Sequence, residues 1–311
     1  MKSVCLAILN YNGVQHLEHL LPSLPAGAEG FHGTLKPVVL DNRSSKGDEA
    51  WVRANHPEVE FVTAPGNEFM YSYNWLASQR SEDIFILINN DTRLTPGFIA
   101  QITRHFPSDD LFSVCAHSLS WEGTEDTCGP ARLTRQHGFY RWAYDMKRQQ
   151  LCHTLYSSSG FMAVDRKKFL ELGGFSRLYF PMYCDDLDLG FRAWRRGWRS
   201  IYDPDSVLYH RENGSGASDW VQRHDLRNSL LFEWSSLPIE AFASQRGLRL
   251  ANLIGRELLS GRRFWFPVWK EARKRWAEER SRYADTKISE TEYQQLCHNL
   301  ELPVPPPPNP S

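Results

Sequence analysis

The first candidate for chemistry is a run of three short polar side chains. Asn89, Asn90 and Asp91 follow one another directly after an apolar stretch. Compact oxygen donors of this kind suit Mg²⁺ or Mn²⁺ that phosphates already hold. Asn and Asp also favour turns, and Thr95 with Pro96 could begin a following helix. Taken alone, the run therefore leaves a metal site and a strand-to-helix turn equally open.

A second acidic motif, Asp185-Asp186, lies at the start of a predicted helix. Leu187, Phe191 and Trp194 recur there at helical spacing. The helix dipole favours negative charge at that end, and two adjacent carboxylates repel each other, so their pKa values are pulled in opposite directions. A carboxylate tuned in this way can take a proton from a hydroxyl. Plain N-capping is the alternative for Asp185, although it does not account for the pair.

The third candidate is His210, which closes a predicted strand shortly after the acidic helix. An imidazole nitrogen is an acceptable Mn²⁺ ligand, although a lone His is more often structural. The segment Gly214-Ser215-Gly216 follows. Such a turn can cover a bound ligand and offer backbone N–H groups to a phosphate.

A regular alternation of strands and helices must position these side chains. The run Ile84–Ile88 is apolar throughout, which is typical of a strand buried on both faces of a parallel sheet. Further strands are predicted at Ser3–Leu9, Lys36–Leu40 and Val59–Thr63, with helical patterns between them. This rhythm predicts a parallel, doubly wound sheet.

Polar residues follow each of these strands, and the carboxyl ends of parallel strands share one edge of a sheet. We therefore expect Asn10, Asp41, Asn67 and Asp91 to converge there. Asp41 could accept hydrogen bonds from a ribose or from a base N–H, although each residue alone could also cap a helix. The first strand lacks a Gly-x-Gly-x-x-Gly motif and no Gly-Lys-Ser/Thr loop occurs, which argues against a dinucleotide oxidoreductase and a P-loop NTPase.

The middle of the chain is less regular. Phe112–Leu119 predicts a strand, and Glu122–Gln149 predicts a long functional loop or flap. Ser200–Asp203 and Val207–Tyr209 predict two short strands. We also expect Asp188 and Arg192 to pair on the outer face of their helix.

The C-terminal region predicts helices at Asp219–Leu237 and Leu248–Leu259. Between Arg256 and Arg282 there are nine Lys or Arg and four Asp or Glu residues, interspersed with tryptophans. A basic, aromatic helix of this kind can lie on an anionic membrane surface. Packing on the catalytic domain, or on the partner in a homodimer, is the alternative.

Composition bounds the class of protein. The chain has 311 residues, of which 41% are hydrophobic and 23% charged, as in a soluble protein with one large α/β domain and an appendage. A net charge of -1 argues against a dedicated nucleic-acid binder. The 11 Trp and 12 Tyr suit either a sugar-binding cleft or a large aromatic core. Six scattered Cys without a Cys-x-x-Cys pair predict reduced thiols in the cytosol, and we expect neither a signal peptide nor a spanning segment.

The order and spacing of these motifs resemble inverting nucleotide-sugar glycosyltransferases of family 2, and most of all their bacterial rhamnosyltransferase-like branch. The matching segments are Leu6–Gly13, Val38–Ser45, Pro65–Trp75, Leu87–Gly97, Ser158–Phe175, Tyr183–Trp198 and the segment that ends at His210. The resemblance implies an α/β protein of the GT-A fold, a Rossmann-like, mostly parallel sheet flanked by helices, with a helical C-terminal extension. The expected parts are a catalytic domain 1–218 (nucleotide-binding half 1–97, acceptor half 98–218), a helical region 219–300 and a disordered Pro-rich tail 301–311.

The resemblance also implies roles for single residues. Asp91 stands at the end of the family's Asp-x-Asp motif and would bind the metal, and His210 would contact the metal or the diphosphate. Asn89 occupies the first position of that motif here. Asp186 would be the catalytic base, and Asp185 would help to shape the acceptor site. The implied donor-binding residues are Asn10, Asn12, Asp41, Asn67, Asn74, Asn89 and Asn90.

The implied reaction moves a sugar, with inversion and with Mg²⁺ or Mn²⁺, from a dTDP- or UDP-sugar to a glycan or a lipid-linked saccharide. Such enzymes act in bacterial cell-surface polysaccharide synthesis, in the cytoplasm or at the inner face of the cell membrane. The alternative function is a catalytically silent module that binds a nucleotide sugar or a glycan on the same fold. A nucleotidyltransferase is a weaker option, because the Gly-rich, Arg-containing amino-terminal loop of that class is missing.

Overall fold

A ten-stranded mixed sheet forms the centre of the molecule in the computed structural model, which describes residues 2–136, 139–211, 218–238, 252, 255–257, 259–261, 265–283, 286–305 and 307. Its strands are β1 (Ser3–Asn10), β2 (Thr34–Asp41), β3 (Glu60–Thr63), β4 (Ile84–Asn89), β5 (Thr92–Leu94), β6 (Leu111–Ser120), β7 (Asp126–Cys128), β10 (Cys152–Thr154), β11 (Phe161–Asp165) and β12 (Arg199–His210). The strand order is β10-β12-β6-β11-β4-β1-β2-β3, with β5 beside β12 and β7 beside β6.

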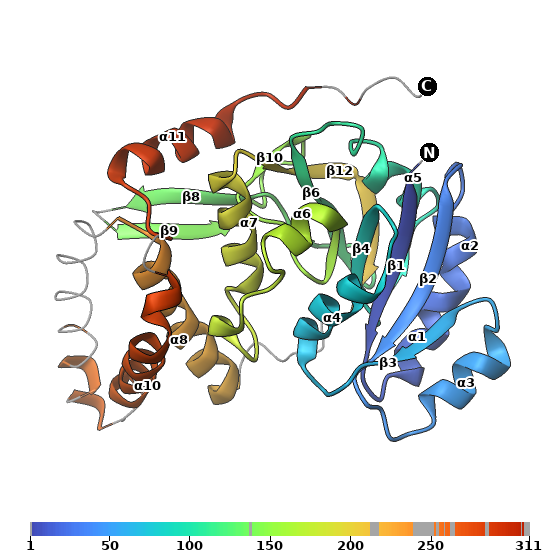
Figure 1. Ribbon diagram of the computed structural model, residues 1–311, viewed down its shortest axis with the longest axis horizontal. Coiled ribbons are helices and arrows are strands. Elements are labelled where there is room, and N and C mark those ends of the chain that lie inside the picture. Colours follow the sequence, from blue (N-terminus) through green and yellow to red (C-terminus); the bar gives the residue numbers. More distant parts are fainter. Residues whose placement is uncertain are drawn as a thin grey trace.

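Helices cover this sheet, and the C-terminal helices lie beside it on one side (Figure 1). They are α1 (Val14–Leu20), α2 (Leu24–Gly27), α3 (Asp48–Asn55), α4 (Ser72–Gln79), α5 (Phe98–Thr103), α6 (Arg166–Glu171), α7 (Asp185–Arg195), α8 (Asp219–Ser236), α10 (Trp265–Glu279) and α11 (Glu290–Glu301). The short 3₁₀ helices are η1 (Leu21–Ser23), η2 (Phe69–Tyr71), η3 (Arg177–Tyr179) and η5 (Arg280–Tyr283).

The first four predicted strands form the expected parallel arrangement. β1 pairs in parallel with β2 and with β4, and β2 pairs in parallel with β3. The run Ile84–Ile88 is fully buried within β4, as its continuous apolar composition predicted. The register sets Asn10 beside Asp41 and Leu9 beside Asn89, so three strand ends meet at one edge of the sheet.

The other half of the sheet departs from this pattern. β11 runs antiparallel to both β4 and β6, which makes the sheet mixed. The two short strands predicted at 200–203 and 207–209 are wrong as separate elements, because both belong to β12. The register of β12 against β6 shifts between Asp203 and Val207, and this irregularity interrupts the sequence pattern without ending the strand.

The loop predicted at Glu122–Gln149 is also wrong over much of its length. It contains β7 and a two-stranded antiparallel sheet of β8 (Ala131–Gln136) and β9 (Phe139–Tyr144). Leu133 and Tyr140 from this hairpin are buried. The alternation that marks a strand was hidden because arginines and aromatic residues, rather than aliphatic ones, fill most of the hairpin positions.

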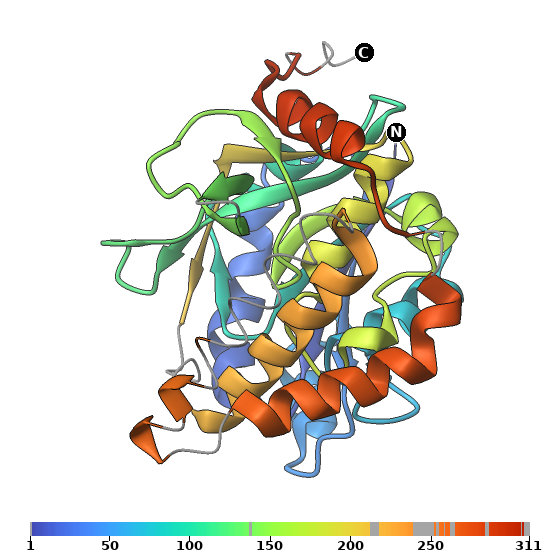
Figure 2. The same cartoon turned by 90° about the vertical axis from the view of Figure 1, so that its left-hand side faces the viewer.

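Two hydrophobic clusters lie on the two faces of the parallel strands, and a third joins this hairpin to the helices on the left of Figure 1. It includes Leu187 and Phe191 of α7, Trp234 of α8, Ala272 of α10 and Leu296 of α11. Figure 2 shows α10 crossing beside α8, and α11 above them. The C-terminal helices therefore pack on the acidic helix. The helix predicted at 248–259 lies mostly outside the described residues, as does the turn at 214–216.

Helix α7 has the predicted apolar face, but its acidic face is placed differently from the expectation. Leu187 and Phe191 are buried, as the helical spacing indicated. Asp188 is buried as well, so the predicted outer pair with Arg192 is wrong in position. Arg192 Nε donates to Asp188 Oδ2 at 2.8 Å, and its other nitrogens donate to the carbonyl oxygens of Leu172 and Gly174. The pair therefore fixes the chain that precedes the helix, and it is not a surface ion pair.

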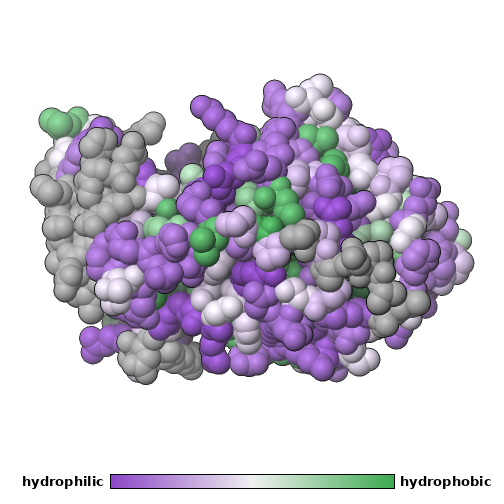
Figure 3. Space-filling model, turned by 90° about the horizontal axis from the view of Figure 1, so that it is seen from above, coloured by the Kyte–Doolittle hydropathy of each residue, from purple (hydrophilic) through white to green (hydrophobic). Residues whose placement is uncertain are grey.

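The surface seen in Figure 3 is mainly hydrophilic, with small apolar patches between polar side chains. Within the described parts of the chain, we find no helix with the length and apolarity needed to cross a membrane. All six cysteines are free thiols, as their scatter along the chain predicted.

Candidate active site

A hydrogen-bonded network ties the ends of three parallel strands together. Asn10 Nδ2, at the end of β1, donates to Asp41 Oδ1 at 3.1 Å and to Asp48 Oδ2 at 3.0 Å. Asn90 Nδ2, just past β4, donates to Asn10 Oδ1 at 2.7 Å. All three acceptors belong to residues that are buried. Asn10 is therefore the hub that holds the strand ends in register.

Asn12 holds the neighbouring loop. Its backbone N–H donates to Ser44 Oγ at 2.7 Å, and its side-chain oxygen accepts from the backbone N–H of Ser45 at 2.9 Å. Asp41 Oδ2 also accepts from the backbone N–H of Ser44. The turns after β1 and β2 thus form one unit, and Asn12 shapes the wall of the site through that unit.

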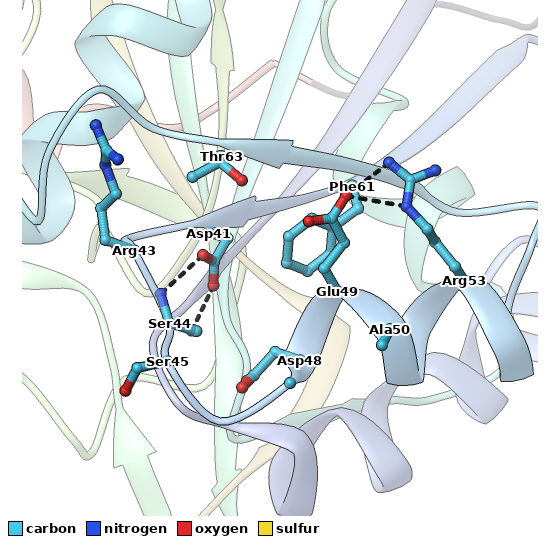
Figure 4. A pocket seen from close by; sticks show the side chains of 11 residues that line it. Asp41, Arg43, Ser44, Ser45, Asp48, Glu49, Ala50, Arg53, Phe61 and Thr63 are labelled. Carbon is cyan, nitrogen blue, oxygen red and sulfur yellow. Dashed lines mark hydrogen bonds and ion pairs between the residues drawn. The ribbon is translucent and has the colours of Figure 1, made fainter.

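A cavity of about 630 Å³ opens beside this network, between the end of β2 and helix α3 (Figure 4). Asp41, Ser44, Asp48 and Thr63 point toward it, and Glu49 and Arg53 pair on its outer side. Hydroxyl and carboxylate groups of this kind can bind the hydroxyls of a ribose and the N–H of a base.

A second cavity, of about 510 Å³, lies on the other side of Asn10. Its walls come from the ends of β1 and β4, from α1 and from the chain before α7. The lining residues are Leu9, Asn10, Tyr11, Gln15, His16, Asn42, Asn67, Phe69, Met70, Asn89, Asn90, Asp91, Ser159, Pro181 and Met182. Five of the predicted site residues therefore share one cavity, and Asn10 connects it to the cavity beside Asp41.

Asp91 lines this cavity, and His210 lies beside it. His210 Nε2 is 3.4 Å from Asp91 Oδ1, within ion-pair distance but without forming a hydrogen bond. Asp91 Oδ1 is buried without a hydrogen-bond partner. An oxygen and a nitrogen donor in this arrangement fit a divalent cation such as Mn²⁺. In the described residues no group of three or more His, Cys, Asp or Glu side chains could hold a metal, so further ligands have to come from a bound phosphate or from water.

The two carboxylates at the start of α7 have different surroundings. Asp185 is buried, and burial, followed by the charge of Asp186, raises its pKa well above the usual value. Its Oδ2 has no hydrogen-bond partner. Asp186 is partly exposed and accepts hydrogen bonds from the backbone N–H groups of Leu187 and Ser159. Burial raises the pKa of Asp186 to about 6, which these two hydrogen bonds only partly oppose.

The segment Ser159–Phe161 lies between the acidic helix α7 and the pair formed by Asp91 and His210. Ser159 lines the smaller cavity and donates to Asp186. The carbonyl oxygen of the next residue, Gly160, accepts from the backbone N–H of Asn89 at 2.9 Å. The ring of Phe161 lies 5.7 Å from that of His210. Asp186 and the Asp91–His210 pair therefore approach the same short stretch of chain.

Asn74 lines neither of these two cavities, and the same is true of Asn12, Asp185, Asp186 and His210. Its side-chain amide donates to the carbonyl oxygen of Phe175 at 2.9 Å and accepts from the backbone N–H of Phe175 at 2.8 Å. Gly174, at φ +67°, has no room for a Cβ beside this amide. The side chain of Asn74 is thus engaged in holding the turn after α6.

Three residues of the site were not found by sequence reasoning. His16 lines the smaller cavity from α1, and Asp48 accepts from Asn10 and from the backbone N–H of Gly13. Ser159 reaches Asp186 through its backbone. A search for polar residues in the first turn of each helix after a strand would have found His16 and Asp48, but no side-chain pattern signals a backbone donor.

Three comparisons with known proteins bear on this geometry. Residues 84–227 match the model of the family described as "Glycosyl transferase family group 2". An N-acetylglucosaminyl-diphospho-decaprenol L-rhamnosyltransferase from Mycobacterium tuberculosis is 42% identical over 60 residues, which is 19% of this chain and 19% of that protein. The O-antigen biosynthesis protein RfbC of Myxococcus xanthus is 25% identical over 162 residues, 49% of this chain and 13% of that protein. The chain thus matches less than a fifth of the length of each of these relatives.

Two solved structures share the fold. GalNAc-T7 with UDP, GalNAc and Mn²⁺ has a TM-score of 0.57 at 12% identity, over 73% of this chain and 47% of that one. The mannosyltransferase PcManGT from Pyrobaculum calidifontis, with GDP-Man and Mn²⁺, has a TM-score of 0.55 at 17% identity, over 74% and 63% of the two chains. These similarities confirm the fold that the sequence motifs predicted.

Proposed function

Because this chain carries a domain of glycosyltransferase family group 2 on the GT-A fold, we propose that it is a metal-dependent, inverting sugar transferase. The donor is a nucleotide sugar, with dTDP- or UDP-sugars as the proposed class. The acceptor is a hydroxyl of a glycan or of a lipid-linked saccharide in bacterial cell-surface polysaccharide synthesis. The rhamnosyltransferase and O-antigen relatives support this choice of acceptor.

One observation carries the proposal. A carboxylate with a pKa of about 6, Asp186, and a buried carboxylate oxygen without a partner, on Asp91, are linked through the single segment Ser159–Phe161. The first can remove a proton near neutral pH, and the second can hold a cation. A transferase of this class needs both functions on opposite sides of the anomeric carbon, the base at the attacking hydroxyl and the cation at the leaving group.

The proposed chemistry is a direct displacement. The acceptor hydroxyl attacks the anomeric carbon of the donor while Asp186 takes the hydroxyl proton, and the nucleoside diphosphate leaves with the bonding electrons. Attack from the face opposite the leaving group inverts the anomeric centre. Backbone N–H groups of Leu187 and Ser159 hold the Asp186 carboxylate in place for this transfer.

Asp91 and His210 would hold the divalent cation, Mg²⁺ or Mn²⁺, which supplies charge neutralisation at the departing diphosphate when bound. Asp41 and Asn10 would bind the nucleoside between the two cavities, with Asn12 shaping the loop beside them. Asn67, Asn89 and Asn90 would line the path of the diphosphate and the sugar. Asn74 would act on the donor indirectly, through the turn that it holds.

The proposed division of labour follows the predicted parts of the chain. Residues 1–97 would bind the nucleotide and residues 98–218 the acceptor, within a catalytic domain 1–218. The helical region 219–300 would support the acidic helix, since α8 and α10 pack close to it. In the tail 301–311, Glu301 still belongs to α11, His153 Nδ1 lies 3.1 Å from the carbonyl oxygen of Leu302, and Val304 packs against a core cluster. Residues 306 and 308–311 lie outside the described part of the chain.

A thermal-shift screen tests the donor and the metal together. We expect a nucleotide sugar with Mn²⁺ to raise the melting temperature, since ligand at about 100 times its Kd stabilises a protein by about 2.7 kcal/mol. Asp91→Ala should remove the Mn²⁺-dependent part of donor binding, measured by calorimetry, whereas Asp109→Ala, an exposed carboxylate elsewhere, should leave it intact. Equal donor affinity with and without Mn²⁺ in the unmodified protein would contradict the metal role.

A second assay separates a transferase from a silent binding module. Donor hydrolysis without acceptor measures bond breaking at the anomeric carbon directly. Donor binding without any hydrolysis or transfer, across the acceptors screened, would favour the binding module.

A further inference from the structure

Two arginine side chains stack on one tryptophan beside Asp91. The guanidinium carbons of Arg93 and Arg211 lie 5.0 and 4.4 Å from the centroid of the Trp121 ring, and that of Arg93 also lies 4.4 Å from the ring of Tyr209. We call Arg93, Trp121, Tyr209 and Arg211 the arginine–aromatic cluster. Its members come from three separate stretches of the chain, so only the fold brings them together.

The cluster borders the smaller cavity on the side of Asp91. Arg93 and Tyr209 are partners in the pairing of β5 with β12. The backbone N–H of Arg211 donates to the carbonyl oxygen of Asp91 at 2.9 Å. His16, which lines the cavity, lies within the electrostatic reach of both Asp91 and Arg211. The Arg211 side chain therefore faces the same space as the proposed metal ligand.

The charges of the cluster are not balanced by the protein. Among the residues that the structure describes, neither Arg93 nor Arg211 forms an ion pair with a carboxylate, whereas Arg104 and Arg192 do. The two guanidinium carbons can be no further apart than their two distances to the Trp121 centroid together. Two like charges held this close repel each other, and an anion between them would remove that repulsion.

Stacking also prepares the arginines for an anion. A guanidinium group that lies on an aromatic face keeps its N–H edge free, and that edge matches the oxygens of a phosphate. The ring restricts the side chain beforehand, so less rotational freedom is lost when the ligand binds. A phosphate makes two charge-assisted hydrogen bonds with each such group.

We propose that the arginine–aromatic cluster is a phosphate-binding subsite for a substrate. This inference rests on the proposed transferase function, and it leaves two sources for the phosphate. One is the diphosphate of the nucleotide-sugar donor. The other is the phosphate that joins the sugar to the lipid in a lipid-linked acceptor.

Binding of inorganic pyrophosphate to the full chain, in buffer with a chelator and no divalent cation, tests the subsite without requiring transfer. Arg93→Gln and Arg211→Gln should each weaken this binding by about tenfold, because each removes one guanidinium group and its charge-assisted hydrogen bonds to the phosphate. Arg196→Gln serves as the matched control, since Arg196 is exposed and pairs with Glu171 at the far end of α7. Arg211→Lys keeps the charge and should lose less affinity than Arg211→Gln.

A second arm assigns the source. The same binding measurement is repeated with UDP or dTDP and Mg²⁺ at saturation. If the donor fills the subsite, the unmodified protein and the Gln variants should then have the same affinity for pyrophosphate. If the acceptor fills it, the tenfold difference should persist in the nucleotide-loaded protein. Both results support a phosphate subsite and differ only in which substrate, donor or acceptor, supplies the phosphate.

The proposal fails if folded Gln variants, checked by their melting temperature, bind pyrophosphate as tightly as the unmodified protein. If one Gln variant does not fold, Trp121→Phe, which keeps an aromatic face, and Arg211→Lys provide the comparison. A chain that shows the pyrophosphate effect but no transfer would retain the subsite and lose the proposed function. The two ideas are therefore separable.

Discussion

At the scale of single residues, the adjacent carboxylates of α7 show how surroundings assign different roles to the same side chain. Asp185 is buried with an oxygen that no donor reaches, so its charged form is strongly disfavoured. Asp186, one residue further, accepts two backbone hydrogen bonds and retains access to solvent. Of the two carboxylates, only that of Asp186 is reached by solvent.

Asp186→Asn should abolish transfer while donor binding survives, because the amide cannot accept the proton of the hydroxyl. In the unmodified protein, kcat/KM should fall about tenfold for each pH unit below about 6, since the base must be ionised and its pKa is about 6. Transfer kinetics and donor calorimetry across pH 4.5–8 check both statements. Unchanged turnover in Asp186→Asn would remove this residue from the role of base.

Asp185→Asn should make the protein more stable near neutral pH. The pKa of Asp185 is raised in the folded state, so the folded protein binds this proton more tightly than the unfolded chain. Stability from this group is therefore present at low pH and is lost as pH rises from the unfolded value of about 3.9 toward the raised folded value. Removing the charge should raise the melting temperature by roughly 2–4 °C for each kcal/mol regained.

The matched control is Asp109→Asn, which changes an exposed carboxylate. The difference in melting temperature between Asp185→Asn and the unmodified protein should become smaller as the pH is lowered toward 4. A variant that melts lower than the unmodified protein at pH 7 would show that Asp185 makes a stabilising contact in its ionised form.

At the scale of elements, the C-terminal helix α8 fixes the loop that presents the acidic pair. Tyr183 and Cys184 precede α7 with φ of 71° and 63°, a left-handed conformation that non-glycine residues rarely adopt. The side-chain amide of Asn228, buried in α8, donates to the carbonyl oxygens of Tyr179, Met182 and Tyr183. One residue of α8 thus fixes the backbone of the loop before α7, which α7 itself does not contact in this way.

Asn228→Ala should therefore impair catalysis from a distance. We expect a loss of about 1–3 kcal/mol in the free energy of unfolding, because buried carbonyl groups lose their donor. kcat should fall by a larger factor than KM for the donor rises, because the larger cavity lies on other elements and only Pro181 and Met182 of this loop line the smaller one. Gln222→Ala, at an exposed position of the same helix, is the control for denaturant unfolding and kinetics. Equal losses in donor affinity and kcat would indicate general disruption rather than positioning.

At the scale of the whole molecule, three hydrophobic clusters stabilise different parts of the fold. Two of them lie on opposite faces of the parallel strands, and the third joins the β8–β9 hairpin to α7, α8, α10 and α11. Helix α10 buries Val268 and Ala272 and leaves Phe266, which is 55% exposed, on its outer side. Packing on the catalytic domain, one of the two alternatives for this basic segment, is therefore confirmed for α10. The outer side remains available to a membrane or to a second copy of the chain.

We expect that outer side to bind anionic membranes, where a lipid-linked acceptor resides. Lys270 and Lys274 are exposed near Phe266 on α10. The double change Lys270→Glu and Lys274→Glu should reduce flotation of the full chain with phosphatidylglycerol vesicles, because each basic residue near an anionic surface contributes about 1 kcal/mol. Neutral phosphatidylcholine vesicles should bind neither form.

Lys46→Glu with Lys147→Glu alters the net charge equally at exposed positions elsewhere and should keep flotation intact. Equal flotation of both double variants would attribute binding to net charge instead of α10. No flotation, together with a dimer in light scattering that the α10 changes disrupt, would favour a homodimer contact on this side.

The sequence by itself determined the parallel strands, their polar ends and the acidic helix. These features arise from local patterns: Ile84–Ile88 is apolar throughout, and Leu187 and Phe191 repeat at helical spacing. The register of parallel strands then follows from one shared edge, so Asn10, Asp41 and Asp91 could be grouped before any coordinates. Roles taken from motif positions, such as that of Asp186 as base, stay predictions.

Tertiary structure decided what local patterns do not encode. The side chain of Asn74 turned away from both cavities because Phe175, a hundred residues later in the chain, satisfies its amide. Asp188 became buried because α8 and η3 cover a helix face that looked exposed in isolation. The cluster of Arg93, Trp121 and Arg211 likewise depends on the packing of β5 and the β6–β7 turn against β12. In each case the deciding partner is distant in sequence, and the spacing along one element carries no record of it.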